Sequence, residues 1–288
     1  MYKVVTKRFL NEAKTICLFE IEAPLVARHA RAGQFVIFRL DEYGERVPVS
    51  VAGYDREKGT VTVMVQAAGR TTKMLHTVEQ GDYIHDFVGP LGKATEMEGL
   101  KKVCVVGGGV GCAIAYPIAK EMHERGIEVT FIAGFRSADI VILKDELKEV
   151  SDKLIMCTDD GSYGHKGFTT VFLKNEIETN IAWQKPQFDR VIAIGPDIMM
   201  KFLAEVTRPY GIKTIISLDP IMVDGTGMCG CCRVIVGGET KFACVDGPDF
   251  DAHLVDFDSL IKRAAFYKDE QEEAAKHICR ITGGKRNA

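Results

Sequence analysis

Residues 102–119 read KVCVVGGGVGCAIAYPIA, and this stretch decides the fold class of the chain. An apolar, strand-like run, Lys102–Val106, leads into four glycines within positions 107–111 and then into an apolar, helix-like segment. A strand, a glycine turn and a helix N-terminus together suit a dinucleotide pyrophosphate, because backbone N–H groups then face the phosphates. Cys112 stands at the third glycine position of G-x-G-x-x-G, so a tight turn without a ligand is the alternative. We favour the phosphate site, since four glycines are more than a turn requires.

Outward from this stretch, two different patterns lie on its two sides. On the C-terminal side strands and helices alternate, with strands expected at 128–133, 154–157 and 190–194 and helices at 113–125, 144–150, 168–175 and 197–207. Such alternation predicts a parallel sheet covered by helices. On the N-terminal side only short strands are expected, at 3–6, 16–21, 33–40, 47–52 and 60–65, with one short helix at 71–78. This second pattern predicts a small antiparallel barrel.

The predicted architecture is therefore an N-terminal antiparallel β-barrel, an α/β parallel-sheet nucleotide-binding domain and a small C-terminal subdomain. The expected boundaries are 1–97 for the barrel, 98–215 for the α/β domain, 216–250 for a segment rich in Gly and Cys, and 251–288 for a helical tail.

Composition excludes several classes of protein. The 288 residues include 40 Asp and Glu and 37 Lys and Arg, with a net charge of −3 and 46% hydrophobic residues. This is an ordinary globular composition, so we exclude a disordered or collagen-like chain and a polybasic nucleic-acid binder. Glycines and Pro117 interrupt the longest apolar run, and no apolar signal segment begins the sequence. We therefore expect no membrane span and a cytoplasmic location.

A cysteine-rich loop carries the most specific signal. Residues 224–232 read DGTGMCGCC, and Cys244 follows. Plant-type [2Fe–2S] sites use C-x4-C-x2-C and a distant fourth cysteine, a spacing that Asp224, Cys229, Cys232 and Cys244 reproduce with Asp in the first position. The glycines let the loop wrap closely around a cluster. We therefore predict a [2Fe–2S] site with these four ligands.

Other uses of the cysteines remain open. Structural zinc is the first alternative, although adjacent Cys231 and Cys232 rarely ligate one ion and the paired C-x2-C hairpins of zinc sites are missing. A disulfide is the second. Within the iron–sulfur interpretation, Cys231 is the alternative fourth ligand, with Asp224 a turn residue. The remaining cysteines lie mostly in apolar stretches and are expected to be buried thiols: Cys17, Cys104, Cys112, Cys157 and Cys279.

Further loops follow the carboxyl ends of predicted strands, where open α/β sheets bind ligands. Arg136 follows the strand at 128–133 and suits a 2′-phosphate, whereas no carboxylate stands there for a ribose hydroxyl. The choice between NAD and NADP is therefore open at this point. The expected NAD(P) contacts are Gly107, Gly109, Val110, Gly111, Arg136, Asp159, Asp160, Gly195 and Pro196.

These pieces in this order resemble the ferredoxin–NADP reductase superfamily, in particular its branch with a C-terminal [2Fe–2S] loop. That branch includes the electron-transfer subunit of dihydroorotate dehydrogenase and the beta subunit of sulfide dehydrogenase. It also includes the small subunit of NADH-dependent reduced ferredoxin:NADP oxidoreductase. The resemblance covers nearly the whole chain, and the Asp at position 224 is most similar to the last of these.

The resemblance implies where a flavin binds. The family's flavin motif is R-x-Y-S or R-P-x-S; residues 48–50 match its end, with Val47 in the usual Arg position and Arg46 one position earlier. Gly195-Pro196 matches the family's C-G-P motif, with Ile194 in place of Cys. The implied FAD contacts are Arg46, Pro48, Val49, Ser50, Val65, Gly69, Thr71 and Thr72.

The implied activity is exchange of hydride between NAD(H), with NADP(H) as the alternative, and FAD, followed by relay of single electrons through the [2Fe–2S] cluster. The implied partner is a larger flavoprotein subunit with FAD and [4Fe–4S] clusters, and the heterodimer would couple NADH, NADPH and ferredoxin by electron bifurcation. No catalytic acid or base is expected in this chain. One alternative is that the chain is the electron-transfer subunit of a dihydroorotate dehydrogenase or a sulfide dehydrogenase. An alternative of another class is a zinc-stabilised nucleotide sensor.

Overall fold

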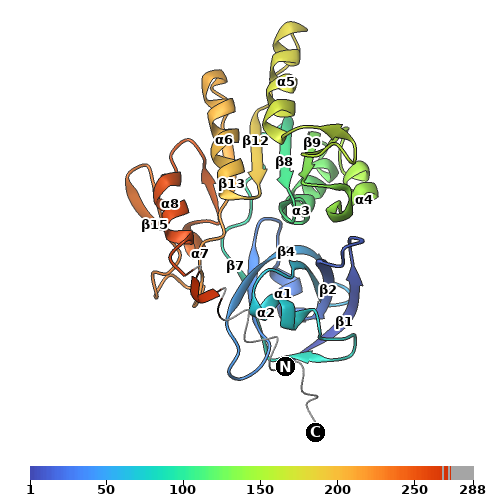
Figure 1. Ribbon diagram of the computed structural model, residues 1–288, viewed down its shortest axis with the longest axis vertical. Coiled ribbons are helices and arrows are strands. Elements are labelled where there is room, and N and C mark those ends of the chain that lie inside the picture. The colour runs from blue at the N-terminus through green and yellow to red at the C-terminus, as the bar shows by residue number, and fades with distance from the viewer. Residues whose placement is uncertain (268, 272, 274–288) are drawn as a thin grey trace.

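The computed structural model describes residues 1–267, 269–271 and 273, and it contains two large sheets, one above the other (Figure 1). The lower sheet is a nearly closed antiparallel barrel with the strand order β6-β1-β2-β5-β4-β3-β7. In β2 and β5 buried and less buried residues alternate, as a strand with one face on a core requires. The strands are β1 (Tyr2–Phe9), β2 (Ile16–Glu22), β3 (Phe35–Arg39), β4 (Val47–Asp55), β5 (Thr60–Gln66), β6 (Tyr83–Ile84) and β7 (Asp86–Leu91).

Two short helices accompany the barrel, α1 (Pro24–His29) and α2 (Arg70–Leu75). The sequence pattern predicted α2 but missed α1, β6 and β7. Gly89 and Pro90 lie inside β7 and read as a turn, yet β7 pairs with β3 alone, and proline is tolerated in such an edge strand. β6 has only two residues and so carries no periodicity.

The upper sheet has the order β11-β10-β9-β8-β12-β13-β16 and is parallel except for its edge strand β16. Its strands are β8 (Lys102–Gly108), β9 (Glu128–Phe135), β10 (Lys153–Thr158), β11 (His165–Lys166), β12 (Arg190–Ile194), β13 (Thr214–Ser217) and β16 (Asp249–Asp251). The covering helices are α3 (Gly111–Glu124), α4 (Lys144–Glu149), α5 (Thr169–Ala182) and α6 (Asp197–Thr207), with short 3-10 turns at Ala138–Ile140 and Arg208–Tyr210. The chain winds from β8 outward in both directions, so the sheet has a topological switch point beside β8.

The predicted combination of an antiparallel barrel with a parallel α/β sheet is thus confirmed. The predicted limits of β12 and α6 agree with the structure, whereas α5 extends to Ala182, well beyond the predicted end at 175. Among the residues that the structure describes, no helix has the length and apolar character needed to cross a lipid bilayer.

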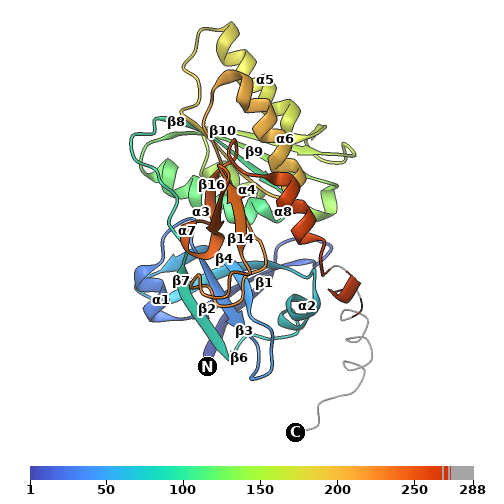
Figure 2. The ribbon, with the colours of Figure 1, turned by 90° about the vertical axis from the view of Figure 1, so that its left-hand side faces the viewer.

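The segment after β13 lies over the junction of the two sheets (Figure 2). It contains a hairpin, β14 (Arg233–Val236) and β15 (Glu239–Phe242), a helical turn α7 (Ala243–Asp246) and, after β16, helix α8 (Phe257–Ala264). Gly237 and Gly238 form the two-residue hairpin loop with φ of +61° and +81°, which suits a type I′ turn. The predicted tail helix at 259–280 overlaps α8, and its part from 274 on lies outside the described residues.

Candidate functional site

A cleft of about 1350 Å³ opens between the barrel and the α/β domain. Single ligand pockets usually measure about 300–1,000 Å³, so this cleft has room for an extended ligand or for two ligands side by side. The predicted site residues on its walls are Pro48, Val49, Ser50, Gly109, Val110, Gly111, Arg136, Asp159, Gly195 and Pro196. The fold therefore brings three predicted groups together: one barrel strand, the glycine turn and the loops at the carboxyl ends of the parallel strands.

The glycine turn is shaped by close packing as well as by backbone conformation. Gly109 has a φ of +56°, which favours glycine, and its N–H donates to the Gly134 carbonyl at 2.8 Å. A methyl group on Gly111 would overlap the Ile194 carbonyl oxygen, so α3 approaches β12 as closely as a glycine permits. Val110, at the N-terminus of α3, provides no side-chain cap. Gly109, Val110 and Gly111 line the cleft, so this helix end borders it, where an anion is favoured.

Arg136 and Asp159 lie on neighbouring strand ends. The Asp159 N–H donates to the Phe135 carbonyl at 3.0 Å, and both charged residues line the cleft. A carboxylate therefore lines the cleft at the end of the strand next to the one that Arg136 follows, although none follows the same strand in the sequence. Asp160 is placed differently, because its carboxylate accepts hydrogen bonds from the N–H and hydroxyl of Ser162 at 2.9 and 2.6 Å.

Two further carboxylates line the cleft, both at carboxyl ends of strands. Asp197 begins α6, directly after Gly195 and Pro196 in a loop that was expected to line the cleft, whereas Asp219, which follows β13, escaped the sequence analysis. Burial and the neighbouring Asp219 charge raise the pKa of Asp197 to about 6. Burial also raises the pKa of Asp219. Phe168 and Phe202, likewise unpredicted, add aromatic surface to the cleft.

The predicted flavin residues occupy two places. Residues 48–50 line the cleft from β4, whereas Thr71, at the start of α2, lines a smaller pocket of about 440 Å³ bounded by the loop at 40–45. The Thr72 hydroxyl accepts from the Ala68 and Gly69 N–H groups at 3.1 and 3.0 Å and so shapes the turn before α2. Val65 is buried in the barrel core and lines neither pocket.

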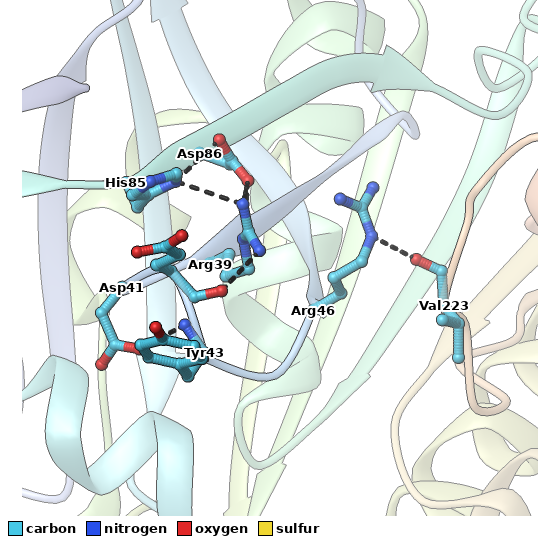
Figure 3. Close-up of polar contacts among 8 residues, drawn as sticks. Arg39, Asp41, Tyr43, Arg46, His85, Asp86 and Val223 are labelled. Atoms are coloured by element: carbon cyan, nitrogen blue, oxygen red, sulfur yellow. Dashed lines mark hydrogen bonds and ion pairs between the residues drawn. The ribbon is translucent and has the colours of Figure 1, made fainter.

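Arg46 lies outside the cleft lining. Its Nε donates to the carbonyl oxygen of Val223 at 2.6 Å, which joins the barrel to the cysteine-rich segment (Figure 3). Its predicted contact with a flavin phosphate stays a prediction.

In the cysteine loop, two of the predicted ligands are already paired. The sulfurs of Cys232 and Cys244 lie 3.2 Å apart, and both residues are buried. A disulfide bond would need about 2.05 Å, so this pair is two separate thiols. Cys229 is exposed, and Cys231 is half-buried and lines the cleft.

Asp224 organises the loop around these thiols. Its carboxylate accepts hydrogen bonds from the backbone N–H groups of Thr226, Met228 and Cys229 at 3.0, 2.9 and 2.8 Å. These bonds hold the pKa of Asp224 well below its usual range, so the side chain is an anion. Three glycines with φ between +67° and +82°, at 225, 227 and 230, let the loop curl around this carboxylate.

The donor set fits an iron–sulfur cluster. Each iron of a [2Fe–2S] cluster takes two protein ligands, and thiolates are the ligands that such clusters prefer. The Cys232–Cys244 pair supplies two thiols side by side, and the anionic Asp224 and exposed Cys229 lie on one loop. In the described part of the chain no three His, Cys, Asp or Glu side chains converge on one point, as a mononuclear site requires.

Comparison with known proteins gives the same assignment for this segment. Residues 219–256 match the family model described as the iron–sulfur cluster binding domain of dihydroorotate dehydrogenase B. The buried cysteine pair and the loop at 224–230 fall within the matched residues.

Relatives match almost the full length. The chain is 50% identical over 285 residues to an uncharacterized protein of Clostridium beijerinckii, covering 96% of this chain and 94% of the relative. It is 45% identical over 271 residues to a dihydroorotate dehydrogenase B (NAD(+)) electron transfer subunit homolog of Thermotoga maritima, covering 94% of each.

Solved structures agree. One chain of the NADH-dependent reduced ferredoxin-NADP oxidoreductase, described in connection with flavin-based electron bifurcation, superposes with a TM-score of 0.87 at 45% identity, over 96% of this chain and 97% of that one. Phthalate dioxygenase reductase superposes with a TM-score of 0.60 at 17% identity, over 82% and 85% of the two chains, and shares the fold. The chain therefore belongs to the family of dihydroorotate dehydrogenase B-type electron-transfer subunits, which combine the ferredoxin reductase fold with a C-terminal iron–sulfur binding domain.

Proposed function

We propose that this chain exchanges hydride between NAD(H) and FAD and relays single electrons through a [2Fe–2S] cluster to a partner subunit. One observation carries the proposal: the barrel strand at 48–50, the glycine turn at 108–111 and Cys231 of the cluster loop line a single cleft. Bound FAD would supply the conversion between two-electron and one-electron transfer. The chain itself binds and orients the redox groups and limits their access to water.

The dinucleotide is proposed to lie across the carboxyl ends of the parallel strands. The N-terminus of α3, at Val110 and Gly111 on the cleft wall, would face the pyrophosphate. Arg136 and Asp159 then lie at one end of the site, and Gly195 and Pro196 at the other. The Asp159 carboxylate suits ribose hydroxyls and disfavours a 2′-phosphate, so we propose NAD(H) as the ligand.

The flavin is proposed to lie against residues 48–50, with its phosphates near the start of α2. Val49 stands where the family's motif has Tyr, so an aliphatic surface would contact the flavin ring at that position. Gly69, Thr71 and Thr72 shape the turn before α2, which supports this part of the proposal.

For the cluster we propose Asp224, Cys229, Cys232 and Cys244 as ligands, with Cys231 as the alternative to Asp224. The hydrogen bond from the Cys229 N–H keeps Asp224 beside its neighbouring ligand and in the anionic form that iron requires. Three thiolates and one carboxylate would then hold the two irons of the cluster, two protein ligands on each.

The relatives act as subunits, and a larger complex is therefore part of the proposal. We propose a larger flavoprotein partner with FAD and [4Fe–4S] clusters, and a cytoplasmic complex that couples NADH, NADPH and ferredoxin. The similarity to the bifurcating oxidoreductase supports this choice. The iron–sulfur family model supports a second candidate, the electron-transfer subunit of a dihydroorotate dehydrogenase.

Co-purification from the native host under anaerobic conditions tests the proposal. We expect the chain to carry iron, acid-labile sulfide and FAD, and to bring a second flavoprotein with it. NADH should reduce the flavin of the isolated chain faster than NADPH does. Zinc in place of iron would overturn the proposed cluster and favour the zinc-stabilised alternative, and a partner that oxidises dihydroorotate would establish the second candidate.

A further inference from the structure

Two arginines donate hydrogen bonds to the backbone on either side of the cluster loop. Arg46, between β3 and β4, donates from Nε to the Val223 carbonyl at 2.6 Å (Figure 3). Arg263, in α8, donates from Nη2 to the Cys231 carbonyl at 3.1 Å. The two acceptors bracket residues 224–230, so one cation from the barrel and one from the C-terminal helix hold the two ends of the loop.

The position of Arg46 in the sequence explains its direction. Successive side chains near a strand point to opposite faces, so a shift of one residue reverses the side chain. Val47 packs on the core of the barrel, and Arg46 projects the other way, toward the cysteine segment. Arg39, on the preceding strand, stays within the barrel, where it pairs with Asp86 at 2.7 Å (Figure 3).

The barrel also forms an apolar wall behind the loop. A methyl group on Gly225 would lie 2.7 Å from Leu91 Cδ1 and 2.8 Å from Ile37 Cδ1, so the loop backbone rests directly on β7 and β3. Cys232 and Cys244 belong to the same apolar core cluster as Ile37. The barrel and the cluster loop are therefore in apolar contact at Gly225, and Arg46 adds a polar contact between them at Val223.

We propose that Arg46 and Arg263 are positioning residues that fix the two ends of the cluster loop, and that their charges raise the reduction potential of the cluster. The proposal rests on the proposed [2Fe–2S] cluster. Reduction adds one electron to the cluster, and nearby positive charge stabilises the added negative charge. A hydrogen bond from a guanidinium is also stronger than a neutral one, so each arginine restrains the backbone that it contacts.

Arginine-to-glutamine and arginine-to-lysine variants separate the two effects. Arg46→Gln and Arg263→Gln remove charge and contact together, whereas Arg46→Lys and Arg263→Lys keep the charge and lose the guanidinium geometry. Arg28→Gln is the matched control, because Arg28 is an exposed barrel residue and its replacement changes the net charge equally. The measurements are the cluster potential by EPR-monitored titration, the rate of cluster loss to an iron chelator, and the affinity for FAD.

We expect both glutamine variants to lower the potential and to speed cluster loss by about three- to tenfold, the range of one ordinary hydrogen bond, because the contact of Arg46 is exposed to solvent. The lysine variants should lose the cluster faster while keeping most of the potential. Arg263→Gln and the control should keep the wild-type affinity for FAD, and the control should also keep the wild-type potential and rate of cluster loss.

Unchanged potential and unchanged cluster loss in both glutamine variants would overturn the proposal. A loss of FAD affinity in Arg46→Gln with normal cluster behaviour would instead place Arg46 at the flavin. If a glutamine variant does not fold, the rate of cluster loss in the lysine variant at the same position is compared with the wild-type rate instead. Wild-type protein without iron would refute the proposed function itself, which is a different result.

Discussion

At the scale of single residues, the environment of a side chain decides what its chemistry contributes. Asp224 is short, anionic and held by three backbone N–H groups, whereas its rival Cys231 is half-buried on the cleft side of the loop. A carboxylate is a harder ligand than a thiolate and donates less electron density to iron, so the two possible ligands predict different clusters.

The variants Asp224→Cys and Cys231→Ser distinguish these ligands. If Asp224 is the fourth ligand, Asp224→Cys should keep the cluster with a changed potential and a changed EPR spectrum, because thiolate replaces carboxylate. Cys231→Ser should then leave both unchanged. Cluster loss in Cys231→Ser, together with an unaltered spectrum in Asp224→Ala, would identify Cys231 as the ligand.

Asp159 is expected to select between the two pyridine nucleotides. Asp159 lines the cleft, as Arg136 does, and its carboxylate would repel a 2′-phosphate bound there. Asp159→Asn should therefore improve the use of NADPH relative to NADH by about tenfold, the effect of roughly 1.4 kcal/mol. Stopped-flow reduction of the flavin by each nucleotide measures this ratio. Asp160→Asn is the control, because that carboxylate is bound to Ser162; an equal change in both variants would contradict the assignment.

At the scale of secondary-structure elements, the glycine turn that lines the cleft lies between β8, which pairs with β12, and the start of α3, which packs closely on the end of β12. Gly109 has open space around it and needs only its positive φ, whereas Gly111 is pressed against the Ile194 carbonyl. Gly109 is therefore required by its backbone conformation, and Gly111 by the lack of space for a side chain.

Alanine substitution should separate these constraints. Gly109→Ala is expected to lower the free energy of unfolding by about 1 kcal/mol, the cost of a left-handed alanine. Gly111→Ala should lower it by about 2–3 kcal/mol, because backbone must move to relieve the overlap. Urea denaturation measures both, and equal losses would show that α3 shifts freely. Gly53→Ala, whose methyl group would meet Thr62 at an ordinary 3.5 Å, is the control.

The strand pair β13–β16 places a carboxylate where three segments meet. Asp249 pairs with Ser217 across the strands, and its Oδ2 accepts from Thr95 Oγ1 in the connection between the domains at 2.6 Å. Its Oδ1 is buried and has no hydrogen-bond partner in the described structure. Burial therefore raises the pKa of Asp249 to about 6.

The raised pKa predicts a pH-dependent stability. Between the unfolded value near 4 and the folded value the native state binds the extra proton, so stability falls as pH rises through this window. Asp249→Asn should remove the slope and raise the free energy of unfolding at pH 8 by about 1–3 kcal/mol. Urea melts at pH 5 and pH 8 test this, and a variant that keeps the wild-type slope would show that another group is responsible.

At the scale of the whole molecule, one cleft and one cluster loop imply a definite cofactor content. The purified chain should hold one FAD, two irons and two acid-labile sulfides, since the barrel and the loop each provide one site. Flavin and metal analysis of anaerobically purified protein gives the ratio. Half the iron with full flavin would indicate loss from the exposed Cys229 side, and added iron and sulfide should then restore it.

Much of this arrangement follows from local sequence. The periodicity around 102–119 predicted a strand, a turn and a helix in the observed order, although β8 extends through Gly107 and Gly108 and α3 begins at Gly111. The elements Arg190–Ile194 and Asp197–Thr207 begin and end as expected. The spacing of Asp224, Cys229, Cys232 and Cys244 predicted an iron–sulfur segment that the family model matches. Periodicity and spacing are properties of neighbouring residues, so they are readable before the chain folds.

Only the tertiary structure decided which distant residues meet. It placed Asp159 and Arg136 on the wall of one cleft, paired β16 with β13 at the edge of the parallel sheet, and brought the sulfur of Cys232 within 3.2 Å of that of Cys244. It also carried Arg46 to Val223, 177 residues away in the sequence. Such contacts depend on how the layers of the fold pack against one another, and the local sequence around each residue does not determine that packing.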